Sequence, residues 1–174
     1  MLVLGLDISQ TSTGWAVLKD SLLIDYGTLE FDRKKRLGDN LMLFHEFLKS
    51  ILLRHQPLDV ISIEDTFTGK NPKVSALLTR YSGTAIVTSR LFSSDSRMLL
   101  LAVASIRSSI STDVKKFLAA NNLPVRSGLV DKEEVFKYIC SIHKLKNIPN
   151  DVTDAIAAAT VPFTKKEIED HWVI

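Results

Sequence analysis

Residues 2–18 read LVLGLDISQTSTGWAVL and contain the two strands from which the rest of the fold is predicted. The segment Leu2–Asp7 is almost wholly apolar, which is typical of a strand that is buried on both faces. Polar, turn-forming residues occupy Ser9–Gly14, and Trp15–Leu18 is apolar again. The pattern predicts a hairpin whose first strand lies inside a sheet and ends in the acidic residue Asp7.

The remaining sequence predicts further strands and then helices. Apolar residues recur first in runs of strand length and later at three- and four-residue spacing, which is the period of a helix. The predicted strands are Leu22–Phe31, Val60–Glu64 and Met98–Ala104. The predicted helices are a segment from Asn40 that ends before Pro57, Val74–Phe92 with Pro72 in its first turn, Ser111–Ala120, Asp131–His143 and Asn150–Thr160. A meander of strands followed by alternating strands and helices indicates a mixed α/β sheet in one domain over residues 1–174.

Composition excludes several classes of protein. The 174 residues are 45% hydrophobic and 24% charged, the mix of a globular protein and not of a disordered one. The single cysteine, Cys140, allows no disulfide within the chain, and the four scattered histidines form no zinc motif. No apolar run reaches 18 residues, and the N-terminus lacks the features of a signal peptide. We therefore expect a cytoplasmic protein without a membrane segment.

Four acidic residues stand where carboxylates are unusual. Asp7 and Glu64 close two apolar strands, and Asp151 and Asp154 are three residues apart, so both lie on one face of the last helix. In open α/β sheets, functional groups gather at the carboxyl ends of neighbouring strands. Four carboxylates brought together would repel one another unless cations lay between them, and such oxygen ligands suit Mg²⁺ or Mn²⁺. Taken singly, each acid has a simpler interpretation as a turn residue or a helix cap.

Five stretches of the sequence together match one family pattern. They are LGLDISQTSTGWAV (4–17), ISIEDTFTGKN (61–71), DVKKFL (113–118), DKEEV (131–135) and NDVTDAIAAA (150–159). In these stretches the chain resembles the RuvC-like Holliday-junction resolvases of the RNase H-like superfamily. The resemblance implies an RNase H-like α/β fold with a mixed five-stranded sheet flanked by helices. It also implies that Asp7, Glu64, Asp151 and Asp154 are catalytic residues that hold two Mg²⁺ ions, for which Mn²⁺ can substitute.

The same resemblance assigns basic and aromatic residues to the DNA. Lys115 and Lys132 match the basic residues that reach the scissile phosphate, and Phe67 matches an aromatic residue that contacts unpaired bases. Independently, residues 107–146 include eight basic and four acidic side chains, a local net charge of +4 that suits phosphate contacts. A solvated helix face is the alternative interpretation of this charge. The predicted DNA contacts are Phe67, Lys70, Arg107, Lys115, Lys116, Arg126 and Lys132.

Two stretches depart from the family pattern. Residues 121–128 are longer than the short glycine-containing stretch that usually separates the two basic elements. Ser105-Ile106-Arg107 stands where the family has a proline-containing strand end. The departures indicate a divergent member of a phage or viral type, which would act in the host cytoplasm.

The expected function is a homodimeric endonuclease that cleaves Holliday junctions and other branched DNA by hydrolysis, giving 5′-phosphate and 3′-hydroxyl ends. A two-fold dimer supplies the two symmetric cuts that a four-way junction requires. The candidate interface is the helix Val74–Phe92, whose Leu77, Leu78, Tyr81 and Ile86 have core packing as their alternative.

Other functions remain open at this stage. They are an RNase H-like nuclease that acts on RNA or RNA–DNA hybrids, and a non-catalytic nucleic-acid-binding relative. A nucleotide-binding module of the actin and sugar-kinase type is disfavoured, because the chain has only seven glycines with no clustered pair and about half the required length.

Overall fold

The computed structural model describes residues 1–65 and 71–164, which form a mixed five-stranded sheet flanked by helices. The strand order is β3-β2-β1-β4-β5, in which β1, β2 and β3 form an antiparallel meander, while β4 and β5 run parallel to β1. The strands are β1 (Leu2–Ile8), β2 (Ser12–Lys19), β3 (Leu22–Glu30), β4 (Val60–Glu64) and β5 (Arg97–Leu101). The predicted sheet is confirmed.

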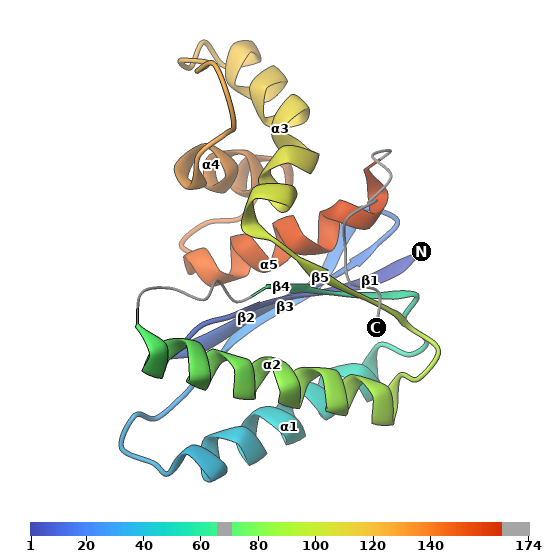
Figure 1. Ribbon diagram of the computed structural model, residues 1–174. Coiled ribbons are helices and arrows are strands. Elements are labelled where there is room, and N and C mark those ends of the chain that lie inside the picture. The colour runs from blue at the N-terminus through green and yellow to red at the C-terminus, as the bar shows by residue number, and fades with distance from the viewer. Residues whose placement is uncertain (66–70, 165–174) are drawn as a thin grey trace.

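The helices cover both faces of the sheet (Figure 1). One face carries α1 (Leu37–Arg54) and α2 (Pro72–Phe92), and the opposite face carries α5 (Asn150–Thr160). The pair α3 (Val103–Ala120) and α4 (Lys132–Ile142) extends outward on the α5 side, and the short 3-10 helix η1 (Val161–Phe163) follows α5. No helix within the described ranges is long and apolar enough to cross a membrane.

Alternating side chains of the central strand build two separate cores. Val3 on β1 packs with the cluster under α5, whereas Leu4 and Leu6 pack with the cluster under α1 and α2. Tyr81 of α2 is only 1% exposed, and its ring stacks on Phe31 at a centroid distance of 4.3 Å. The sequence named Tyr81 as a candidate interface residue, but its side chain belongs to the core.

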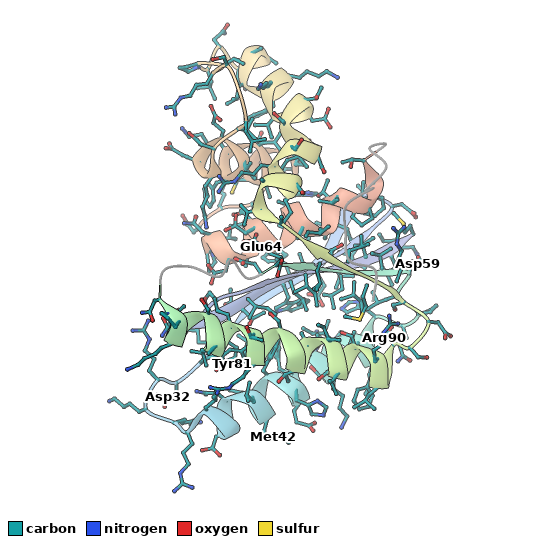
Figure 2. All side chains as sticks on the ribbon, viewed as in Figure 1. Asp32, Met42, Asp59, Glu64, Tyr81 and Arg90 are labelled. Atoms are coloured by element: carbon teal, nitrogen blue, oxygen red, sulfur yellow. The ribbon has the colours of Figure 1, made fainter. Side chains whose placement is uncertain are left out.

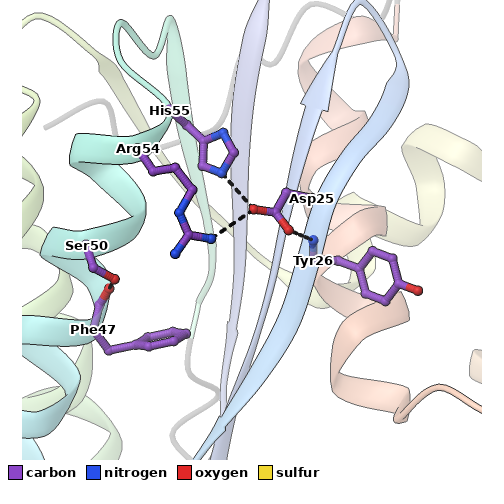
Figure 3. A network of polar contacts seen from close by, with 6 residues as sticks. All are labelled: Asp25, Tyr26, Phe47, Ser50, Arg54 and His55. Atoms are coloured by element: carbon purple, nitrogen blue, oxygen red, sulfur yellow. Dashed lines mark hydrogen bonds and ion pairs between the residues drawn. The ribbon is translucent and has the colours of Figure 1, made fainter.

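A polar network ties the end of α1 to the edge strand β3 (Figure 3). The Asp25 carboxylate lies 2.9 Å from His55 Nε2 and accepts a hydrogen bond of 3.3 Å from the Arg54 guanidinium. This network fixes the position of α1 against the sheet on the side away from α5.

The helix α5 lies unusually close to the sheet, because glycines face it from β1 and β2. A Cβ atom placed on Gly5 would be 2.1 Å from the Ala155 carbonyl oxygen, and one on Gly14 would be 2.0 Å from the Asp151 carbonyl oxygen. No side chain fits at either position, so strand and helix backbones are in direct contact. Ala155 and Ala159 continue this stripe of small residues along α5.

One predicted boundary is wrong. The strand β5 ends at Leu101 and α3 begins at Val103, whereas the sequence pattern extended the strand to Ala104 and began the helix at Ser111. The residues in between are rich in Val, Ile and Ser, which have no strong helix propensity. They are nevertheless helical, because Ile106 and Ile110 continue the buried stripe of α3 at four-residue spacing.

The backbone contact under α5 predicts a selective effect of a single methyl group. We expect Gly5→Ala to lower the free energy of unfolding by about 1–3 kcal/mol or more, because overpacking must push α5 from the sheet. Gly38→Ala is the matched control, since a Cβ there meets nothing within 4 Å. Urea unfolding of both variants measures the difference, and equal stabilities would contradict the close contact.

Candidate active site

Two acidic side chains lie side by side at the carboxyl ends of the central parallel strands. Leu6 of β1 pairs with Ile63 of β4, so the next residues, Asp7 and Glu64, are neighbours. Side chains alternate along a strand, and therefore Asp7 points to the same face as Gly5, the face covered by α5. Figure 2 shows Glu64 between the sheet and α5.

The first turns of α5 bring two more carboxylates to the same place. Gly14, which is paired with Asp7 across the hairpin, touches the backbone of Asp151. Asp154 follows one turn later on the same helix face. Pro149 is the N-cap of α5, so Asp151 does not cap this helix. The structure thus brings together all four acids that the sequence singled out.

Burial and mutual repulsion perturb the two strand acids strongly. The pKa of Asp7 is raised from 3.8 to about 8, first by burial and then by repulsion from Glu64, Asp154 and Asp151. The pKa of Glu64 is raised from 4.5 to about 7, again first by burial and then by Asp154. The surroundings therefore do not compensate the negative charge that the four acids would carry if all of them were ionised.

Two polar side chains contact Asp151 and Asp154, the two acids of α5. Ser12 Oγ donates a hydrogen bond to Asp151, and Lys132 Nζ forms an ion pair with Asp154. Lys132 is the first residue of α4, where a capping box between Asp131 and Glu134 fixes the helix start. Lys132 thus lies beside the acids, and its expected contact with the scissile phosphate stays a prediction.

Arg107 is a further cation at the site, and Lys115 is not beside it. A cavity of about 160 Å³ is lined by Glu64, Arg107, Lys132 and Asp154, together with apolar residues of α3, α4 and α5. Lys115 lies eight residues further along α3, roughly 12 Å along the axis, and its Nζ donates to the Gly128 carbonyl at 2.6 Å. The sequence expected Lys115 at the scissile phosphate and gave Arg107 only a DNA contact.

Lys115 was expected there because residues 113–118 resemble a family element, whereas the start of α3 decides which basic side chain faces the acids. With α3 beginning at Val103, its first turns lie next to the end of β5 and present Arg107 to Glu64. The signal was present in Ser105-Ile106-Arg107, which carries a basic residue shortly after the start of α3. Ser12 was missed altogether, because nothing local in the sequence links it to Asp151.

The other predicted DNA contacts lie outside this cluster. Lys116 is exposed on α3 with its Nζ 3.9 Å from Asp113, and Arg126 forms an ion pair of 3.1 Å with Asp131. Both belong to the arm formed by α3, α4 and residues 121–130 (Figure 1). Phe67 and Lys70 fall outside the described residues.

The donor set fits a hard divalent cation. Four carboxylates supply the oxygen ligands that Mg²⁺ and Mn²⁺ prefer, and the raised pKa values of Asp7 and Glu64 mark uncompensated charge that a cation would neutralise. In residues 1–65 and 71–164, no three acidic, histidine or cysteine side chains already converge as metal ligands. Instead, Asp151 accepts a hydrogen bond from Ser12, and Asp154 forms an ion pair with Lys132.

Comparisons with known proteins agree with this arrangement. The family model "Crossover junction endodeoxyribonuclease RuvC" matches residues 3–161. The proteins of that name from Ehrlichia ruminantium (strain Welgevonden) and Caldicellulosiruptor saccharolyticus are 31% and 28% identical, and each alignment covers 91% of this chain and at least 90% of the relative. These two relatives are bacterial, and the phage or viral origin stays a prediction.

The fold is similar to that of a solved structure, T. thermophilus RuvC in complex with Holliday junction substrate. The TM-score is 0.70 at 19% sequence identity, and the match covers 92% of this chain and 91% of the other. This likeness confirms the RNase H-like fold.

The perturbed carboxylates predict how stability depends on pH. Between about pH 4 and pH 8 the unfolded chain releases the Asp7 proton while the folded chain retains it, so the free energy of unfolding falls as the pH rises. Asp7→Asn should reduce this fall in the metal-free protein. At pH 8 the variant should be more stable than the wild type by at least about 1 kcal/mol, since one pKa unit corresponds to about 1.4 kcal/mol.

Urea unfolding between pH 4 and pH 8 in the presence of a chelator measures the effect. Asp95→Asn is the control, because Asp95 is exposed next to the start of β5, away from the acids. If the free energy of unfolding of Asp7→Asn depends on pH as it does in the wild type, the raised pKa of Asp7 is contradicted.

Proposed function

The chain belongs to the RuvC family of crossover junction endodeoxyribonucleases, and we propose that it cleaves Holliday junctions and other branched DNA by metal-dependent hydrolysis. The proposed products carry 5′-phosphate and 3′-hydroxyl ends. The observation that carries the proposal is the cluster of Asp7, Glu64, Asp151 and Asp154 with Lys132 and Arg107 at one edge of the sheet. A single nuclease domain over residues 1–174 is part of the proposal.

In this proposal the acids and the cations of the site divide the work. Asp7, Glu64, Asp151 and Asp154 would hold two Mg²⁺ ions, or Mn²⁺ in their place. Bound there, the ions would activate the attacking water and stabilise the leaving 3′ oxygen. Lys132 and Arg107 line the cavity next to Glu64 and would neutralise the scissile phosphate. Lys115, Lys116 and Arg126 would contact DNA further from the scissile bond. Lys70 and Phe67, which fall outside the described residues, are also proposed to contact DNA, Phe67 through unpaired bases.

Burial of Asp7 and Glu64 favours a catalytic role for the protein over DNA binding alone. An acidic cluster repels phosphate, so a protein that only bound DNA would gain nothing from Asp7 and Glu64 in this place. Their raised pKa values show that the fold tolerates the carboxylates at a cost in stability. Burial of Asp7 and Glu64 thus supports an enzyme over a non-catalytic relative.

The face of the sheet that carries α1 and α2 lies opposite the active site, and its proposed partner is a second copy of the chain. An open groove of about 660 Å³ runs between α1 and α2 and is predominantly apolar, and its lining includes Leu41, Met42, His45, Gly83 and Val87. Met42 and Val87 are 60% and 59% exposed, and Figure 2 shows Met42 on the outer side of α1. A two-fold contact across this groove would leave both active sites free on the α5 side, one for each cut.

Nicking assays test the proposed function. We expect a four-way junction to be cut in Mg²⁺ or Mn²⁺, while linear duplex and an RNA–DNA hybrid stay nearly intact. Glu64→Gln should abolish cutting and retain junction binding, because it removes a ligand charge and no basic residue. The nicks should be sealed by a DNA ligase, which requires 5′-phosphate ends. Faster cutting of the hybrid would favour the ribonuclease alternative.

Arg107 and Lys115 form a matched pair in the same assay. Removal of a charged hydrogen-bond donor at the phosphate costs about 1.5–3 kcal/mol, so Arg107→Ala should slow cleavage of bound junction at least about tenfold. Lys115→Ala should leave the single-turnover rate near that of the wild type, since its ammonium binds Gly128. The reverse result would restore Lys115 to the site.

The dimer has its own test. Val87→Asp places a charge in the α1–α2 groove and should convert a dimer into a monomer of 19.4 kDa in light-scattering measurements. Leu22→Asp is the control, because Leu22 is 70% exposed on β3, outside the groove. A wild-type chain that is monomeric while it cuts junctions would contradict the proposed interface.

A further inference from the structure

One metal-ligand candidate is held by a hydroxyl group from a distant part of the chain. Ser12, the first residue of β2, donates a hydrogen bond from Oγ to Asp151 Oδ2, although 139 positions separate the two residues. Among the described residues, the other carboxylate oxygen, Oδ1, receives no hydrogen bond. Asp151 therefore has one engaged oxygen and one oxygen that accepts no hydrogen bond from residues 1–65 and 71–164.

A self-contained turn fixes the direction of the Ser12 hydroxyl. Ser9 Oγ accepts hydrogen bonds from the backbone N–H groups of Thr11 at 3.3 Å and Ser12 at 3.1 Å. It also lies 3.1 Å from Ser12 Oγ and 3.0 Å from the Ser12 carbonyl oxygen. The backbone closes the same turn through a 2.9 Å hydrogen bond from Ser9 N to Ser12 O. The hydroxyl is thus oriented by the chain itself.

The backbone contact at Gly14 keeps Ser12 within reach of α5. Ser12 and Gly14 are two residues apart on β2, so their side-chain positions face the same side of the sheet. Gly14 touches the Asp151 backbone, which fixes the distance between the start of β2 and the first turn of α5. The contact at Gly14 therefore keeps the Ser12 hydroxyl within hydrogen-bonding reach of Asp151.

We propose that Ser12 is a positioning residue that limits Asp151 to one free oxygen and thereby makes the acidic site favour Mg²⁺ over Ca²⁺. The proposal rests on the proposed function, because it assumes that the four acids hold divalent cations. Mg²⁺ is small, requires near-octahedral geometry and takes few protein carboxylates, whereas Ca²⁺ accepts six to eight oxygens and often binds a carboxylate through both of them. A carboxylate with one oxygen already engaged suits the smaller ion.

Calorimetric titration of the full chain with Mg²⁺ and with Ca²⁺, in the absence of DNA, tests the inference. Residues that hydrogen-bond to metal ligands typically change metal affinity by 10–100-fold when mutated. Ser12→Ala should raise the dissociation constant for Mg²⁺ about tenfold and leave that for Ca²⁺ unchanged or lower. The preference for Mg²⁺ over Ca²⁺ should therefore fall at least about tenfold.

A matched pair isolates the hydroxyl from the packing. Threonine and valine have nearly the same shape and both suit a strand, so Ser12→Thr should keep the ion preference and Ser12→Val should lose it. Ser50→Ala is the remote control, because the Ser50 hydroxyl binds the Phe47 carbonyl on α1. If the alanine variant does not fold, the threonine and valine variants still decide the question.

Two negative results have different meanings. If the wild type binds Mg²⁺ and both Ser12→Ala and Ser12→Val bind Mg²⁺ and Ca²⁺ with unchanged affinities, the role of Ser12 is refuted and the metal site stands. If the wild type binds neither Mg²⁺ nor Mn²⁺, the metal site of the proposed function fails, and the role of Ser12 fails with it.

Discussion

Backbone contact between α5 and the hairpin of β1 and β2 is the constraint on which the rest of the structure depends. Gly5 and Gly14 stand where any side chain would overlap carbonyl oxygens of α5. Because the helix packs at this short distance, its first turn carries Asp151 to the end of β1, where Asp7 lies. A helix held off by ordinary side chains would leave the strand acids and the helix acids apart.

The same contact creates the electrostatic character of the site. Burial and repulsion raise the pKa values of Asp7 and Glu64, and Lys132 and Arg107 offset only part of the negative charge. Functional sites commonly lower the stability of the fold in this way, because the charged groups that bind a ligand lack full partners when the ligand is absent. The surrounding fold supplies the stability elsewhere, through two apolar cores on either side of one sheet.

Much of this arrangement could be predicted from the sequence, because its elements have short-range signals. The apolar run that ends at Asp7 predicts a central strand, and the spacing of Asp151 and Asp154 places both on one helix face. The start of α3 could not be predicted in this way, since local propensity is weak there and packing of Ile106 and Ile110 decides the structure. Lys115 was expected at the site for another reason, the resemblance of residues 113–118 to a family element, and Arg107 lines the cavity beside Glu64 instead.

Long-range contacts are the part of the site that the sequence could not reveal. The hydrogen bond from Ser12 to Asp151 depends on the folded distance between β2 and α5, and neither residue has a local pattern that announces it. The ion pair of Lys132 with Asp154 was expected only in outline, through the resemblance of residues 131–135 to a basic family element. The sequence thus predicted which side chains have the chemistry of a metal site, but it did not predict which residue each of them contacts.

Anomalous diffraction from crystals soaked in Mn²⁺ tests most directly the claim that the four acids form a site for divalent cations. We expect anomalous peaks between Asp7, Glu64 and the first turns of α5, and loss of the peaks in crystals of Asp7→Asn. Absence of a peak at this place in well-diffracting wild-type crystals, or Mn²⁺ bound only at other surfaces, would contradict the claim.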